Sequence, residues 1–111
     1  MDTVTLQKEL DLKLFTKSGA NNNVTDCHIC DLLSHVMAKG REDMVWITVL
    51  SHLNVIAVAC LHDMACVIIP ENIEVPQETL DKADENEIPV FSSPKTAYEL
   101  SCKMCKLGIG I

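Results

Sequence analysis

Two pairs of cysteines have a spacing that is typical of metal and redox sites. Cys27 and Cys30, with His28 between them, form the first pair. Cys102 and Cys105 form the second pair. Four such thiolates can hold zinc or an iron–sulfur cluster, and one pair alone can act as a redox dithiol. One interpretation of the sequence is therefore a cysteine-based metal-binding or thiol-redox accessory protein.

The local pattern around these cysteines favours a different interpretation. If residues 24–30 form a strand, Cys27 and Cys30 point to opposite faces, because side chains alternate along a strand. Cys102 and Cys105 would share one helix face, where cysteines also serve as small apolar core residues. We therefore expect no cofactor, with zinc or an iron–sulfur cluster as the alternative.

Polar side chains follow each predicted strand and could form a site for a ligand. In open parallel sheets, ligands bind outside the carboxyl ends of the strands. The predicted ligand-binding residues at this edge are Asp31, Ser34, Thr48, His52 and Asn54, with Ser92 opposite. Asp31 and Asn54 are also ordinary helix caps. His52 with Asp31 or Ser34 would make a base and its partner, but we see no nucleophile elbow and no phosphate loop, so we expect no enzyme.

The elements that must position these residues alternate along the chain. Short apolar or β-branched runs predict strands over 12–15, 24–30, 44–50, 65–69 and 88–91. Helical patterns predict helices over 32–37, 54–64, 77–86 and 95–107, with Asp31 capping the first and Pro94 in the first turn of the last. This order predicts an α/β fold, a three-layer α/β/α sandwich with a mostly parallel sheet, in which the first strands join in mixed orientation.

The composition limits the class of partner. The formal net charge is −7, and we see no stripe of lysine and arginine, so we expect no nucleic acid and no anionic membrane as a partner. No apolar run has the length of a membrane span, and Met1–Val4 lack the basic and apolar plan of a signal peptide. We therefore expect a cytoplasmic protein whose thiols stay reduced.

Three segments of the chain resemble one known family. Residues 24–37 read VTDCHICDLLSHVM, Trp46-Ile47-Thr48 is followed by His52 and Asn54, and residues 88–92 lead into a predicted helix. Over nearly its whole length the sequence is similar to the DRTGG domain family. The resemblance predicts that residues 1–111 form a single domain similar to the N-terminal domain of HPr kinase/phosphorylase, without its kinase activity.

The resemblance also implies a function. It suggests a non-catalytic regulatory or small-ligand-binding domain, a homodimer with a small anion or nucleotide as ligand, or with a partner protein. Free-standing members of the family often occur near redox and hydrogenase systems. The paired glycines of the family fall where this chain has Asp26 and Cys27, and a third glycine position holds Cys30. Glycine would permit close backbone approach there, so we do not transfer a ligand contact to this segment.

Overall fold

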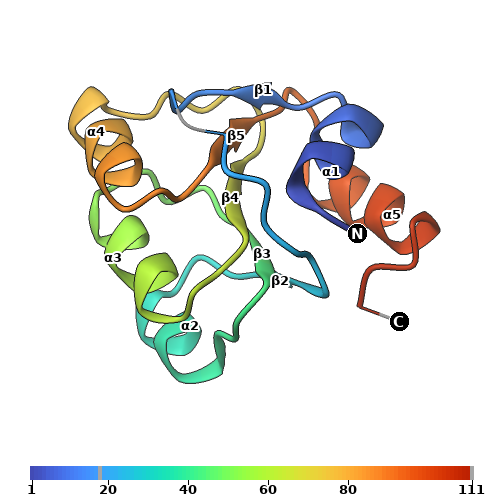
Figure 1. Ribbon diagram of the computed structural model, residues 1–111, viewed down its shortest axis with the longest axis horizontal. Coiled ribbons are helices and arrows are strands. Elements are labelled where there is room, and N and C mark those ends of the chain that lie inside the picture. The colour runs from blue at the N-terminus through green and yellow to red at the C-terminus, as the bar shows by residue number, and fades with distance from the viewer. Residues whose placement is uncertain (18, 111) are drawn as a thin grey trace.

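The computed structural model describes residues 1–17 and 19–110, which contain five helices and five strands (Figure 1). The helices are α1 (Thr3–Leu10), α2 (Leu33–Lys39), α3 (Asn54–Leu61), α4 (Gln77–Glu85) and α5 (Ala97–Lys106). The strands are β1 (Lys13–Leu14), β2 (Asp26–Ile29), β3 (Met44–Ile47), β4 (Cys66–Ile69) and β5 (Val90–Ser92). Each predicted strand and helix therefore exists, with ends that differ by a few residues.

The five strands form one sheet in the order β1-β5-β4-β3-β2. β2, β3, β4 and β5 are parallel, and β1 pairs antiparallel with β5. The register places Cys27 of β2 opposite Val45 of β3, and Val45 opposite Cys66 of β4. The mostly parallel sheet and the mixed orientation of the first strand confirm the predicted arrangement.

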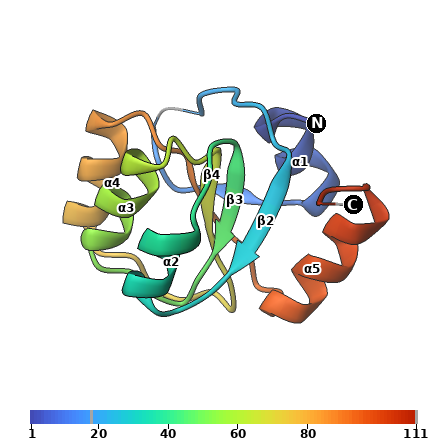
Figure 2. The ribbon, with the colours of Figure 1, turned by 90° about the horizontal axis from the view of Figure 1, so that it is seen from below.

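The strand order determines which helices cover each face of the sheet. From β2 to β5 the chain moves one strand position at a time in the same direction. Because parallel crossovers are right-handed, α2, α3 and α4 all lie on one face. Figure 2 shows these three helices on one side of the sheet and α1 with α5 on the other. The predicted three-layer sandwich is confirmed.

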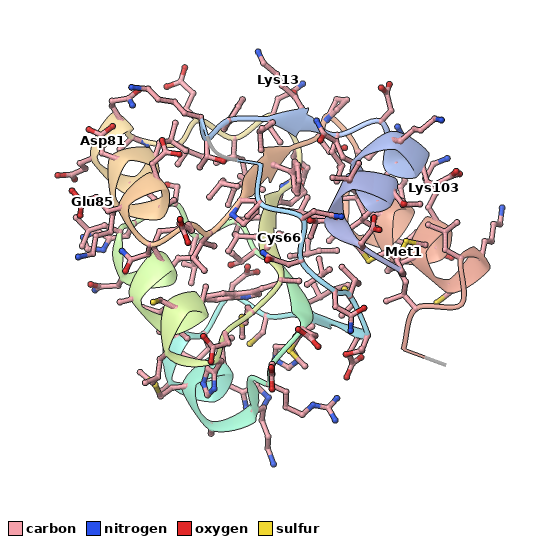
Figure 3. The ribbon with its side chains drawn as sticks, viewed as in Figure 1. Met1, Lys13, Cys66, Asp81, Glu85 and Lys103 are labelled. Atoms are coloured by element: carbon pink, nitrogen blue, oxygen red, sulfur yellow. The ribbon has the colours of Figure 1, made fainter. Side chains whose placement is uncertain are left out.

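The sheet separates two apolar cores. Trp46 faces α2, α3 and α4, whereas Phe91 and Cys66 face α1 and α5. Cys66, labelled near the centre of Figure 3, is fully buried. Every residue of β3 and β4 is buried, which explains their continuous apolar sequences. Each large buried side chain contributes roughly 1.5–3 kcal/mol through removal from water.

Three helix starts differ from the sequence prediction. Asn54 does not cap α3, because the N-cap is Leu53, which makes no capping bond through its side chain. Asp31 does not cap α2: the N-cap is Leu32, which makes no capping bond through its side chain. Asp31 is bound instead to groups that follow β3. Pro94 does not lie in the first turn of α5, because the N-cap is Thr96, which forms a capping box with Glu99. The Asp31 carboxylate therefore serves a contact between distant segments, whereas the capping box of α5 is local.

Helix α1 was not predicted from the sequence. Asp2 caps it by accepting a hydrogen bond from the Thr5 amide at 2.8 Å. Leu6 and Leu10 are its main buried side chains, and they close the core over β1 and β5. In the described residues, none of the helices combines the length and apolar character needed to cross a membrane.

Both ends of the described chain bind the segment that leads into β2. The Val24 amide donates a hydrogen bond to the Met1 carbonyl at 2.8 Å. The Gly110 amide donates to the Thr25 carbonyl at 3.2 Å. The two ends therefore meet beside the amino end of the edge strand, on the side of the sheet that α1 and α5 cover (Figures 1 and 2).

Candidate functional site

The carboxyl ends of the four parallel strands lie at one edge of the sheet. The segments that follow them are 30–32, 48–53, 70–76 and 93–96. The structure therefore places the predicted ligand-binding residues at the expected edge. Their role in binding stays a prediction, and their local contacts differ from residue to residue.

Asp31 and Thr48 are in direct contact. The Thr48 hydroxyl donates to Asp31 Oδ1 at 2.8 Å, and the Val49 amide donates to the same oxygen at 2.9 Å. The Thr48 hydroxyl also accepts a hydrogen bond from the Leu50 amide at 3.1 Å. Thr48 is buried and Asp31 is exposed. The carboxylate therefore links the end of β2 to the end of β3.

His52 and Asn54 lie at the start of α3. The Asn54 amide donates to His52 Nδ1 at 3.1 Å, so a neutral ring carries its proton on Nε2. The Val55 amide donates to the His52 carbonyl at 3.0 Å. These bonds occupy amides in the first turn of α3 that an anion would otherwise use. What His52 offers a ligand is therefore an exposed Nε2–H donor.

Ser34 lies on α2, and Ser92 is separated from this group by the width of the sheet. Ser34 is exposed in the first turn of α2. Ser92 ends β5, three strand positions from β2 in the sheet. At about 4.8 Å for each strand spacing, Ser92 lies about 14 Å across the sheet from the end of β2. The predicted residues thus share an edge but do not converge on one point.

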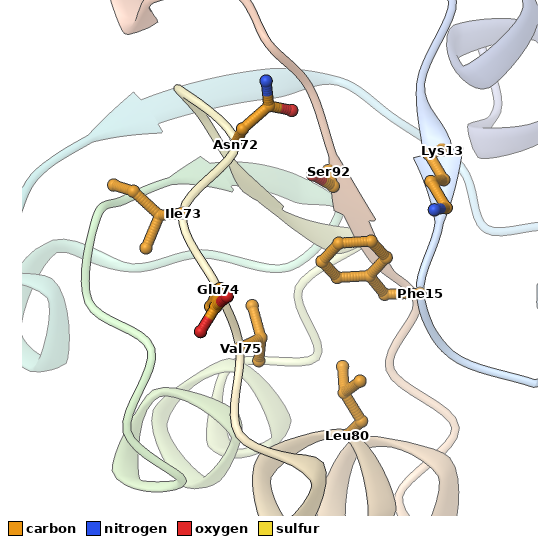
Figure 4. A pocket seen from close by; sticks show the side chains of 8 residues that line it. All are labelled: Lys13, Phe15, Asn72, Ile73, Glu74, Val75, Leu80 and Ser92. Atoms are coloured by element: carbon orange, nitrogen blue, oxygen red, sulfur yellow. The ribbon is translucent and has the colours of Figure 1, made fainter.

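A cavity of about 350 Å³ opens beside Ser92 (Figure 4). Its lining comes from β1, the loop after β4, α4 and β5, and consists of Lys13, Phe15, Asn72, Ile73, Glu74, Val75, Leu80 and Ser92. We call it the Phe15 pocket. It combines an aromatic ring and aliphatic side chains with an amide, a hydroxyl and both signs of charge. This mixture is typical of a site for a small organic molecule.

The charged groups of the Phe15 pocket come from different elements. Lys13 Nζ lies 5.6 Å from the centre of the Phe15 ring, a cation–π arrangement. Glu74 belongs to the loop after β4, and Asn72 in the same loop has a positive φ of 55°. Figure 4 shows the Phe15 ring near the middle of the group, between Ser92 and Leu80. A ligand here would meet the ring together with hydrogen-bonding groups above it.

Sequence reasoning identified only part of this pocket. Ser92 was predicted, whereas Asn72 was not among the predicted ligand-binding residues. Phe15 and Lys13 were missed because β1 joins the far side of the sheet through antiparallel pairing with β5. The one available signal was an aromatic residue at the end of a short predicted strand.

The cysteines are distributed over both faces of the sheet. Cys27 packs against the core beneath α1 and α5, and Cys30 packs against the core beneath α2. This confirms the prediction that strand alternation separates them. Cys102 and Cys105 are exposed on α5, so their interpretation as core residues is wrong. Among the described residues, no group of three or more His, Cys, Asp and Glu side chains could hold a metal ion.

Burial suppresses the chemistry of the interior thiols. Burial, with a smaller effect of Cys105, raises the pKa of the Cys27 thiol to about 12. Burial, with a smaller effect of Cys27, raises the pKa of Cys66 as well. Because the thiolate is the reactive form, both thiols are poor nucleophiles at neutral pH. Their arrangement is suited to packing.

Comparison with known proteins agrees with this architecture. The DRTGG domain family model matches residues 5–107. No curated protein sequence matches the chain. Among solved structures, the CBS and DRTGG domains of the regulatory region of Clostridium perfringens pyrophosphatase, complexed with its activator diadenosine tetraphosphate, are similar, with a TM-score of 0.68 and 12% sequence identity. The match covers 91% of this chain and 44% of that one. The chain belongs to the DRTGG domain family.

Proposed function

We propose that this chain is a non-catalytic regulatory domain that binds an adenine nucleotide at the carboxyl edge of its sheet. Family membership supports a regulatory role. The observation that carries the proposal is the Phe15 pocket, which brings an aromatic ring, a lysine and hydrogen-bonding side chains to that edge. The pyrophosphatase regulatory region with a similar fold is complexed with diadenosine tetraphosphate, which motivates the choice of ligand class.

The lining of the Phe15 pocket suggests how a nucleotide would bind. An adenine base stacks on the Phe15 ring, with Val75 and Leu80 as aliphatic walls. The Ser92 hydroxyl and the amide of Asn72 supply hydrogen bonds to polar atoms of the base or ribose. The ammonium group of Lys13 approaches the phosphate. The cavity of about 350 Å³ suits one nucleoside unit rather than a whole dinucleotide.

The residues predicted from the sequence form a second part of the proposed surface. His52 contributes its Nε2–H donor, and Asn54 and Ser34 contribute exposed polar side chains. Asp31 and Thr48 hold the segments that carry these groups. The proposed role is binding rather than catalysis, because Asp31 Oδ1 and His52 Nδ1 are both occupied by neighbouring groups of the protein.

Isothermal titration calorimetry with adenosine, AMP and ATP tests the proposal. Stacking of a base on an aromatic ring contributes about 1–3 kcal/mol, so Phe15→Ala should raise the Kd for AMP by roughly 5–150-fold. Tyr98→Ala is the matched control, because Tyr98 is an aromatic residue that is 75% exposed on α5. Lys13→Gln should weaken AMP more than adenosine. Absence of saturable AMP binding, or equal weakening by Phe15→Ala and Tyr98→Ala, would contradict the proposal.

We also propose that the domain forms a homodimer in the cytoplasm. β2 is an edge strand, and the apolar residues Ile29 and Leu32 near its carboxyl end are 47% and 61% exposed. Burial of such residues favours association. Light scattering after size exclusion should give twice the chain mass, and Ile29→Lys should give the monomer. A monomer in the unaltered protein would refute this part.

The proposal also includes a link to redox or hydrogenase systems, or to a partner protein. The thiols that such a role would use are Cys102 and Cys105, which are exposed and three residues apart on α5. Thiols of this kind stay reduced in the cytoplasm. Elemental analysis of anaerobically purified protein tests the metal-binding alternative, for which near-stoichiometric zinc or iron would be required.

A further inference from the structure

A second hollow lies far from the Phe15 pocket, beside the edge strand β2. Its volume is about 630 Å³. It is lined by the start of β2, the C-terminal half of α2 and the start of β3, namely Asp26, Cys27, His28, His35, Ala38, Lys39, Gly40, Arg41 and Met44. We call it the β2–α2 hollow. Because it lies toward the amino ends of the parallel strands, it is separate from the proposed nucleotide site.

The β2–α2 hollow concentrates positive charge in an acidic protein. The whole chain has nine lysines and arginines against sixteen acidic residues. This lining contains Lys39, Arg41 and two histidines, whereas Asp26 is its one acidic residue and forms an ion pair with Arg41. A neighbouring hollow has the opposite character, with Glu42, Asp43, Asp63 and Glu87 in its lining. The basic lining is therefore a local feature of the surface.

The two histidines form a stacked pair with an unused nitrogen. The rings of His28 and His35 have centroids 5.7 Å apart and an angle of 18° between their planes. His28 Nε2 is buried, and no hydrogen-bond partner for it exists in the described part of the chain. A buried polar atom without a partner costs stability unless a bound molecule satisfies it. His28 lines the β2–α2 hollow, so a molecule bound there would lie beside this ring.

We propose that the β2–α2 hollow binds a compact oxyanion, either free phosphate or a phosphoryl group on a larger molecule. Lys39 and Arg41 supply the positive charge, and the imidazoles of His28 and His35 supply N–H donors in a fixed, stacked orientation. A metal cation is a poorer candidate, because two cationic side chains line the hollow and the described residues contain no suitable group of three ligands.

The histidine pair makes binding dependent on pH. In the free protein, burial and the neighbouring His35 lower the pKa of His28. The other charged groups that line the hollow are Asp26, Lys39 and Arg41, and Glu42 lines an adjoining hollow together with Arg41. A bound anion stabilises the protonated imidazole, so the anion and a proton bind together. The affinity for a fixed dianion should therefore rise as the pH falls through the histidine range.

Titration with sulfate, followed by NMR of the histidine side chains, tests this proposal. Sulfate remains a dianion between about pH 5.5 and about pH 8, so a change in affinity over that range reports on the protein. We expect one saturable site that shifts the His28 and His35 resonances and tightens up to about tenfold for each unit of pH lowered. Phosphate and AMP, compared at one pH, distinguish a free anion from a phosphoryl group on a nucleotide.

Charge substitutions provide the controls. Lys39→Gln should raise the Kd for sulfate by about tenfold, because one charge-assisted contact is lost. His28→Gln should remove most of the pH dependence, because His28 is the ring whose pKa burial lowers in the free protein. Lys8→Gln, an exposed change on α1 on the other face of the sheet, should have no effect. Phe15→Ala should leave sulfate binding intact, so failure of the nucleotide proposal and failure of this one are distinguishable.

Two results would overturn the oxyanion site. One is a linear, non-saturating response of the His28 and His35 resonances that sodium chloride reproduces at equal ionic strength. The other is equal weakening of sulfate binding by Lys39→Gln and Lys8→Gln, which would indicate general screening of charge rather than a site.

Discussion

The link between Asp31 and Thr48 can be tested by removing each partner alone and both together. Asp31 Oδ1 accepts two hydrogen bonds, from the Thr48 hydroxyl and the Val49 amide, and bonds to a charged group contribute about 1.5–3 kcal/mol each. Because Asp31 is exposed, water compensates for part of the lost hydrogen-bond energy in Asp31→Ala. We therefore expect Asp31→Ala to lower the free energy of unfolding by about 2 kcal/mol, which corresponds to roughly 8 °C in Tm.

Thr48→Val removes the other side of the same link. Thr48 is 1% exposed, and its hydroxyl both donates to Asp31 and accepts from the Leu50 amide. We expect a loss of about 2 kcal/mol for Thr48→Val alone. The double variant should lose about 1–1.5 kcal/mol less than the sum of the single variants, because the shared bond is lost only once.

Urea unfolding followed by tryptophan fluorescence provides the assay. Trp46 is the one tryptophan and is fully buried, and its Nε1 donates to the Cys30 carbonyl at 2.9 Å, next to Asp31. Asp81→Ala is the matched control, since Asp81 is an exposed carboxylate on α4 that accepts from the Gln77 side chain (Figure 3). Asp81→Ala should lower the free energy of unfolding by less than about 0.5 kcal/mol. A coupling energy below about 0.3 kcal/mol between Asp31 and Thr48 would refute the reasoning.

Three further predictions follow from the fold. Thiol titration at pH 8 should label Cys102 rapidly, whereas Cys27 should react only on unfolding, because burial raises its pKa to about 12. Because the pKa of His28 is lowered in the folded protein, the unfolded chain binds more protons in the histidine range. The stability contribution of His28 should therefore be complete above the usual histidine pKa and fall as the pH drops toward the pKa of His28 in the folded protein. The urea midpoint of His28→Gln should decrease less over the same pH range. Gly40→Ala would place a Cβ 2.6 Å from the His62 ring, so it should cost about 1–3 kcal/mol in urea unfolding, and His62→Ala should restore part of the loss.

Much of the fold was predictable because buried strands require apolar residues, which are visible in the sequence. β3 and β4 are covered on both faces, so residues 44–47 and 66–69 are continuous apolar runs that no surface element would have. The apolar pattern of helix α1 is weaker, because only Leu6 and Leu10 among its apolar residues are buried and Val4 is 54% exposed. An eight-residue helix with two buried leucines is hard to separate from a loop by pattern alone.

The candidate site was less predictable because it depends on contacts between distant residues. Asp31 lies where a helix cap is expected, but its carboxylate binds Thr48 and Val49, 17 and 18 residues away along the chain. The Phe15 pocket depends on pairing between Leu14 and Phe91, which are far apart in sequence. Local spacing carries no information about which strand a short edge strand will join.

The hydrogen bonds at the two ends of the chain have a mechanical consequence. Met1 and Gly110 are held by the adjacent residues Val24 and Thr25, immediately before β2. A domain joined at either end would therefore be attached to the sheet at nearly the same point. Any movement of β2, such as one produced by a molecule in the β2–α2 hollow, would reach both joints together. In a larger assembly, a displacement of β2 would therefore change the position of both attached segments relative to the sheet.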